Sequence, residues 1–188
     1  MQQIQQTTSA PVVRASMGNE ISVSFVENKP LIQDQGMMHI DSFMDTLSST
    51  LISLLKSDPT HKTAMGGCSS MAMGMTKDYN ALVPDTKIRR TALKYRNPKN
   101  KPDDTDTLVM EQIASSGNLK KPLVVELPNH YRVYKPLAIK QPCLICHGDR
   151  TTISPDLVKM IDKQYPKDLA TGFRLGEFRG VVVAEVQK

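Results

Sequence analysis

Two cysteines and a histidine stand close together in the last third of the chain, as Cys143, Cys146 and His147. Their Cys-x-x-Cys-His spacing is the attachment motif of c-type haem proteins, in which both thiols add to porphyrin vinyl groups and the adjacent imidazole binds the iron. Placed at random, 3 Cys and 4 His among 188 residues would form this motif on the order of once in a thousand sequences. The motif therefore predicts one covalent haem c per chain, with His147 as the proximal ligand.

Two other chemistries use paired cysteines. A thioredoxin-type redox pair would begin a helix in a β-α-β context, whereas this pair follows a predicted hairpin and precedes a turn at Gly148. A structural zinc site would need a second pair of ligands, and the chain offers one further cysteine, Cys68, together with scattered histidines. Haem attachment is therefore the interpretation that the sequence favours.

The residues alone leave the sixth iron ligand open. A methionine ligand would raise the reduction potential and suit an electron carrier, whereas a thiolate would lower it. A lone cysteine is in most proteins a small buried hydrophobe, and methionines commonly fill gaps in a core. The candidates are Cys68, Met65, Met71, Met73, Met75 and His130, with His39 and His61 on more polar segments.

Arginines and tyrosines supply the other candidate haem contacts. Arg89, Arg90 and Arg96 carry guanidinium groups that pair well with carboxylates such as the haem propionates, although arginines on a strand surface are equally ordinary. Tyr131 and Tyr134 are candidates for the pocket lining, although such tyrosines more often belong to a sheet core. We select Arg89, Arg96, Tyr131 and Tyr134 as the expected cofactor contacts.

Hydrophobic periods and turn signals predict the elements that must position these residues. The expected helices cover residues 37–55, 60–79, 105–116 and 155–165, and the expected strands cover residues 87–95, 123–127, 131–139 and 180–186. Two early helices followed by strands interleaved with short helices predict an α+β domain with one antiparallel sheet. Residues 1–30 are polar and predict a flexible N-terminal arm, which leaves residues 31–188 as a single haem domain.

Composition excludes some classes of function. The chain is 39% hydrophobic and 23% charged, as is ordinary for a globular domain. Lys and Arg exceed Asp and Glu by 24 to 19, but the cations are scattered, so nucleic-acid binding is not expected. A modest positive charge is compatible with docking to an acidic redox partner. No apolar run approaches the ~18 residues of a membrane span.

The first residues lack the basic head and apolar body of a secretory signal. Covalent haem attachment ordinarily follows export. We therefore expect a periplasmic or otherwise exported protein, present here in a mature or truncated form.

Several segments, taken together, carry a family pattern. They are residues 89–100, 131–136, 142–148 and 172–180, together with a cysteine, Cys68, on the helical segment before the first predicted strand. This combination resembles the Tll0287-like haem domain family over roughly residues 35–187. The resemblance implies a PAS-like fold, with a central antiparallel sheet flanked by helices and one haem c held against it. It also implies an unusual axial pair of His147 and Cys68, with methionine ligation as the alternative.

These features predict a haem protein that senses redox state or a diatomic gas such as NO or CO, through release of Cys68 on reduction. The alternative is a small electron-transfer cytochrome whose iron stays six-coordinate. A peroxidase would need acid and base groups above an open iron, and no distinct His/Arg pair supplies them, so enzyme activity is not expected. The expected partner is a redox protein or a gas, and a homodimer is compatible with the sequence.

Overall fold

The computed structural model describes residues 13–14, 22–25 and 29–188. Its helices are α1 (Pro30–Ser57), α2 (Lys62–Leu82), α3 (Asp104–Ser116), α4 (Leu144–His147) and α5 (Pro155–Gln164), with 3-10 turns η1 (Pro98–Asn100) and η2 (Gln141–Cys143). Its strands are β1 (Val13–Arg14), β2 (Ser22–Phe25), β3 (Thr86–Thr91), β4 (Leu123–Glu126), β5 (His130–Ala138) and β6 (Phe178–Gln187). Each predicted helix and strand is confirmed, although several end residues differ.

The strands form one sheet in the order β1-β2-β4-β5-β6-β3, in which all neighbouring strands are antiparallel. β5 and β6 pair along nearly their whole lengths, from His130 opposite Gln187 to Ala138 opposite Phe178. On its other side, β6 pairs with β3 from Thr86 to Thr91. The predicted α+β class with an antiparallel sheet is therefore confirmed.

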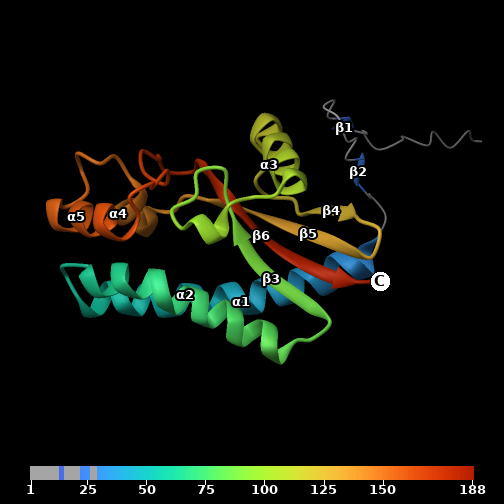
Figure 1. Cartoon of the computed structure of the whole chain (residues 1–188), viewed down its shortest axis with the longest axis horizontal. Helices are drawn as coiled ribbons and strands as arrows, with labels where there is room; N and C mark the ends of the chain where they lie inside the picture. The colour runs from blue at the N-terminus through green and yellow to red at the C-terminus, as the bar shows by residue number, and fades with distance from the viewer. Residues whose placement is uncertain (1–12, 15–21, 26–28) are drawn as a thin grey trace, which may run out of the picture.

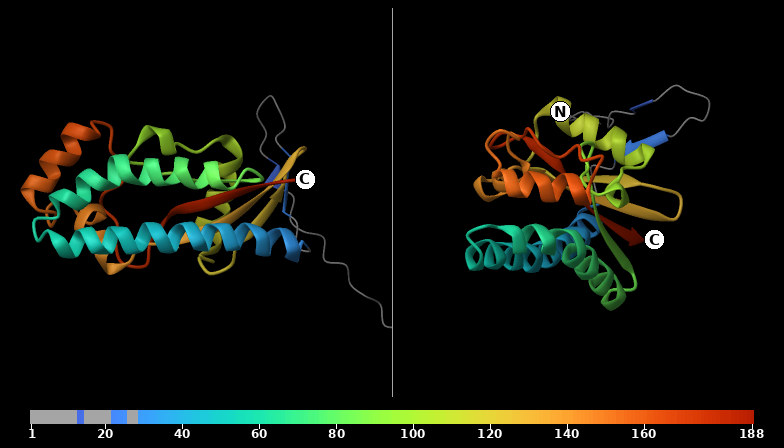
Figure 2. Two further views of the ribbon diagram at one scale, coloured as in Figure 1. Left: turned by 90° about the horizontal axis from the view of Figure 1, so that it is seen from below. Right: turned by 60° about the vertical axis from the view of Figure 1, so that its left-hand side comes forward.

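Helices cover both faces of this sheet (Figure 1). α1 and α2 lie side by side against one face, and α3 lies against the other (Figure 2). Successive side chains of a strand point to opposite faces, and β6 uses both. Val182 and Ala184 pack in the cluster with α1 and α2, whereas Val181 and Val183 pack in the cluster with α3. The valine run of β6 is apolar throughout because both of its faces are buried.

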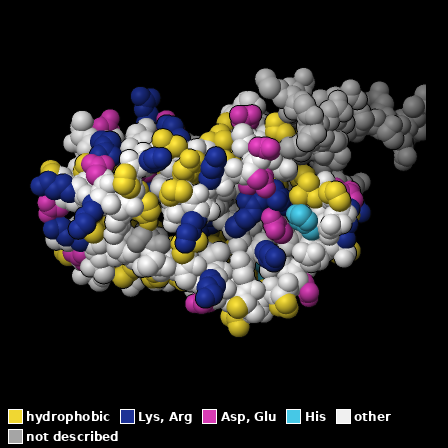
Figure 3. All heavy atoms as spheres, in the orientation of Figure 1, with side chains coloured by type: hydrophobic (Ala, Val, Ile, Leu, Met, Phe, Trp, Pro, Cys, Tyr) yellow, Lys and Arg dark blue, Asp and Glu magenta, His cyan; other side chains and the backbone are white. Residues whose placement is uncertain are grey.

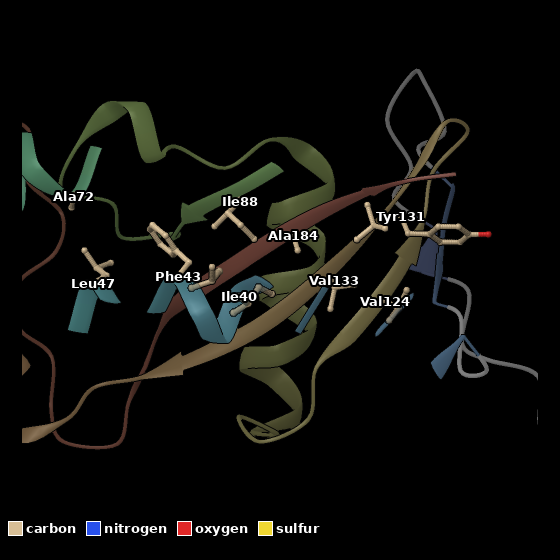
Figure 4. Close-up of a cluster of buried hydrophobic side chains, with 11 residues drawn as sticks. Ile40, Phe43, Leu47, Ala72, Ile88, Val124, Tyr131, Val133 and Ala184 are labelled. Atoms are coloured by element: carbon tan, nitrogen blue, oxygen red, sulfur yellow. The ribbon is translucent and has the colours of Figure 1, made fainter. Parts of the chain in front are cut away.

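The core between α1 and the sheet fixes how α1 lies. Ile40, Phe43 and Leu47 recur at three- and four-residue spacing and point toward the strands (Figure 4). At Gly36 the helix backbone approaches β5 so closely that an added Cβ would lie 2.5 Å from a methyl carbon of Val133. Among the described residues, no helix is both long enough and apolar enough to cross a membrane.

The flexible arm predicted over residues 1–30 requires a correction. Most of it lies outside the described residues, but β2 joins the sheet, where Ser24 and Phe25 pair with Glu126 and Val125 of β4. α1 also begins at Pro30, before the hydrophobic pattern from residue 37 indicated. Proline is favoured in the first helical turn, where its missing N–H costs no hydrogen bond.

Asp106 ties α3 to the sheet. Its carboxylate is fully buried (0% exposed) and accepts two hydrogen bonds from Arg89 of β3. It also accepts hydrogen bonds from the Tyr134 hydroxyl at 2.9 Å and from Arg132 Nη1 at 3.3 Å. Asp103 caps the helix by accepting a bond from the Asp106 N–H at 2.8 Å. A single carboxylate thus fixes α3 against β3 and β5.

Replacing Asp106 by Asn should lower the free energy of unfolding by about 3 kcal/mol, because it leaves Arg89 and Arg132 without their shared buried carboxylate. Asp104→Asn, an exposed change in the same helical turn, should cost less than about 0.5 kcal/mol. Urea unfolding of both variants provides the measurement. Equal losses for the two would show that Asp106 has no special role.

Candidate cofactor site around His147

The Cys-x-x-Cys-His motif forms a single helical turn. η2 ends at Cys143, and α4 continues through Cys146 and His147. Pro142 suits the start of such a turn, and Gly148 leaves it in an extended conformation. Residues three and four apart share a helical face, so Cys146 and His147 lie on the same side of the turn as Cys143. Both cysteines are half-buried.

The imidazole of His147 has a fixed orientation. Its Nδ1 lies 2.6 Å from the carbonyl oxygen of Ala170, and because a carbonyl can only accept, Nδ1 carries the proton. The Phe173 ring packs edge-on against the imidazole, with 6.4 Å between ring centroids. Burial and the charges of Arg179 and Arg96 lower the pKa of His147 to about 3. The ring is therefore neutral, with Nε2 left as the nitrogen able to bind a metal.

Arg96 joins the motif to the loop that orients His147. Its guanidinium donates to both carboxylate oxygens of Asp168, at 3.1 and 3.2 Å. It also donates to the carbonyl oxygens of Cys146 at 2.6 Å and Ala170 at 3.3 Å. The side chains of Arg96 and Asp168 are only 11% and 2% exposed. This buried pair holds in place the carbonyl that binds Nδ1 of His147.

A pocket of ≈ 220 Å³ lies beside the motif turn, where Cys146 and His147 of α4 contribute to its lining. It combines apolar side chains with three arginines and His147. The lining residues are Leu51, Met65, Met73, Arg90, Thr91, Ala92, Tyr95, Arg96, Asn97, Asn100, Leu137, Cys146, His147, Tyr165, Arg179, Gly180 and Val181.

The structure brings only some of the predicted site residues to this pocket. Cys146, His147 and Arg96 line it. Cys143 lies beside them, in a small cluster with Ile139, Ala170 and Phe173. These residues are close together because the end of β5 pairs with the start of β6, so the motif turn that follows β5 and the 168–173 loop that precedes β6 lie at the same end of the sheet.

Three predicted contacts lie elsewhere and need correction. Arg89 and Tyr134 point to the opposite face of the sheet, where both bind Asp106. Tyr131 packs in the cluster under α1, near the far end of β5, and its hydroxyl donates to Glu126 at 3.3 Å. Strand alternation explains Arg89, since its neighbour Arg90 faces the pocket instead.

Of the candidates for the sixth iron ligand, some lie at the pocket and others lie elsewhere. Met65 and Met73 line the pocket. His130 stands at the start of β5, opposite Gln187 at the other end of β6, and His39 Nδ1 is paired with the Tyr79 hydroxyl at 3.1 Å. Cys68 belongs to α2, between Met65 and Met73 in sequence, but its side chain lies outside the described part of the structure.

Sequence reasoning missed several residues of the site. Arg179, Asp168 and Phe173 carry no recognisable motif, and the loop carbonyl of Ala170 has no sequence signal at all. Strand alternation from Arg89 could have identified Arg90 as the inward arginine. Phe173 and Arg179 do fall within the 172–180 segment that carries part of the family pattern.

Arg96→Lys should lower the free energy of unfolding by about 3 kcal/mol, because an ammonium cannot reproduce the planar fork that binds Asp168 inside the protein. The matched control is Arg150→Lys. Arg150 also binds both oxygens of an aspartate, Asp162, but the two side chains are 42% and 57% exposed. That change should cost less than about 1 kcal/mol. Denaturant titration of each variant decides, and a larger loss at Arg150 would contradict the role given to Arg96.

Comparisons with known proteins identify the fold and the family of the chain. The crystal structure of the cyanobacterial heme-protein Tll0287 shares the fold, with a TM-score of 0.64 and 22% sequence identity, over 81% of this chain and 94% of that chain. Among curated proteins, none matches the sequence. The family model described as Tll0287-like matches residues 2–186, which confirms the resemblance seen in the sequence. The chain therefore belongs to the Tll0287-like family.

Proposed function

We propose that this chain is a monohaem c-type haem protein, with the haem attached through Cys143 and Cys146 and with His147 as the proximal ligand. The observation that carries the proposal is the hydrogen bond from Nδ1 of His147 to the Ala170 carbonyl. Histidines that bind metals commonly donate their other ring N–H to a carbonyl in this way, which fixes the tautomer and the ring orientation.

The other residues of the pocket fit a haem in chemical type. Two thiols stand on the same side of a helical turn as the imidazole, beside apolar and aromatic side chains. Arginines of the same pocket suit the carboxylates that a haem carries. When bound, a haem supplies an iron that changes oxidation state and that binds diatomic gases when one axial position is open. The sheet with helices on both faces supports a PAS-like frame for this cofactor.

For the role of the haem, we favour a sensor of redox state or of a diatomic gas such as NO or CO, in which Cys68 would be the second protein ligand of the iron. α2 carries Cys68 and packs onto the sheet core through Ala72. Release of Cys68 would free this part of α2, and Ala72 would pass the shift to the strands. Gly66, Gly67 and Gly74 lower the intrinsic stability of α2, which favours such a movement.

A second candidate function is electron transfer between redox proteins. It is favoured by Met65 and Met73, which both line the pocket and could supply a thioether ligand. Met ligation raises the reduction potential and suits an electron carrier. Lys and Arg side chains lie among Asp and Glu side chains at the left end of the molecule in Figure 3, and the net charge of +5 is compatible with docking of an acidic partner. In both roles we propose an exported protein without enzyme activity.

Haem attachment is tested by expressing the chain with a c-type haem maturation system. The wild type should carry one covalent haem, seen as added mass and as haem staining after denaturation. Changing both Cys143 and Cys146 to Ala should abolish both signals, because the two thiols form the thioether bonds. Cys68→Ala, which removes the third cysteine, should retain them. Absence of covalent haem from the wild-type chain would contradict the proposal.

The two roles are separated by electron paramagnetic resonance of the oxidised protein and by optical spectra after reduction with carbon monoxide. For a sensor, a low-spin thiolate signal should disappear in Cys68→Ala, and reduced wild type should bind carbon monoxide. For an electron carrier, the spectra of Cys68→Ala should be the same as those of the wild type. The spectra should instead change in Met65→Leu or Met73→Leu, which keep the apolar volume but remove the sulfur. Reduced wild type that keeps both ligands and excludes carbon monoxide would rule out the sensor.

A further inference from the structure

The arginines on the two faces of the sheet differ in how many carboxylates lie near them. Under α3, Arg89 and Arg132 are balanced by Asp103, Asp106 and Glu185. On the pocket side, Arg90, Arg96 and Arg179 all line the pocket, whereas no Asp or Glu is found among the described residues that line it. Asp168, which pairs with Arg96, lies behind the lining, so the lining itself is positive.

Arg179 differs from Arg96 in its partners: Arg96 is paired with Asp168, whereas Arg179 bonds to a backbone carbonyl. It is the second residue of β6, and its Nη1 donates to the backbone carbonyl of Lys94 at 3.0 Å. Its guanidinium carbon lies 5.4 Å from the centre of the Phe173 ring, which supports one face of the group. Within the part of the chain that the structure describes, Arg179 forms no ion pair.

The electrostatic cost of this arrangement points to an anion. Burial and the nearby charge of Arg96 lower the pKa of Arg179 to about 10, so the group is still charged at neutral pH. The carboxylate of Asp168 opposes this effect, but it is already bound on both oxygens by Arg96. A half-buried charge next to a like charge is stabilised when a counter-charge pairs with it. A guanidinium also offers a planar fork of N–H groups that can bind a carboxylate through two hydrogen bonds.

We propose that Arg179 is a carboxylate-binding subsite of the pocket, with Arg90 adding positive charge, and that its ligand is a propionate of the haem. This inference rests on the proposed haem protein. It also revises the expected contacts, because Arg89 and Arg96 are committed to Asp106 and Asp168. Arg179 is thus a positioning residue that also sets the charge around the haem.

The test compares the haem-loaded wild type with Arg179→Gln and Arg179→Lys, with Arg174→Gln as the control. Arg174 is an exposed arginine in the loop before β6. Arg179→Gln should lower the midpoint reduction potential, because removing a nearby positive charge favours the ferric state. It should also raise the pH at which propionate ionisation changes the potential, because the carboxylate loses its cation. Arg174→Gln should change neither quantity, since solvent screens its charge.

Arg179→Lys keeps the charge and should hold the potential close to the wild-type value, which separates a charge effect from a packing defect over Phe173. An unchanged potential and pH profile in folded, haem-loaded Arg179→Gln would overturn the inference. So would equal shifts in Arg179→Gln and Arg174→Gln.

If the chain carries no haem, the proposed function is refuted, but the carboxylate subsite can still be tested in the haem-free protein. Succinate, a small dicarboxylate, should then raise the melting temperature of the wild type more than that of Arg179→Gln, because both of its carboxylates can enter a positive pocket. Equal effects of succinate on the two chains would overturn the carboxylate subsite itself.

Discussion

β6 lies inside the sheet with helices on both of its faces, and the positions of the other elements depend on that burial. Because side chains alternate along a strand, Val182 packs toward α1 and α2 while Val183 packs toward α3. β3 pairs in register with β6, so Arg90 stands opposite Val182 and Arg89 opposite Val183. Consecutive arginines therefore have different environments, one at the pocket and the other at Asp106 under α3.

The pocket end of the molecule is held by contacts between segments far apart in the sequence. Arg96 follows β3, Cys146 belongs to the motif turn, and Asp168 and Ala170 precede β6. One planar guanidinium bonds to all of them, and the carbonyl of Ala170 then orients the imidazole of His147. The imidazole of His147 is thus oriented through a buried ion pair as well as by the short helix that carries it.

α2 is where the two proposed roles differ. Near its N-terminal end, Met65 both lines the pocket and packs against Leu157 and Ile161 of α5. One face farther along α2 joins the main core through Ala72. A ligand on α2 would therefore couple the iron to the sheet, whereas a helix that never moves would suit electron transfer. The charge at the pocket is common to both roles, since it depends on β3, β6 and the loop after β3.

The sequence by itself determined whatever depends on residues close together along the chain. Cys143, Cys146 and His147 lie within one helical turn. Hydrophobic periodicity located α1, α2, α3 and α5 and strands β3 to β6, whereas β1, β2 and the short helix α4 were missed. The partners of Arg89, Tyr134 and Arg179 were decided only by the tertiary structure. The face of a strand that meets a pocket, and the carboxylate that reaches an arginine, depend on contacts between residues distant in sequence, which local patterns do not encode.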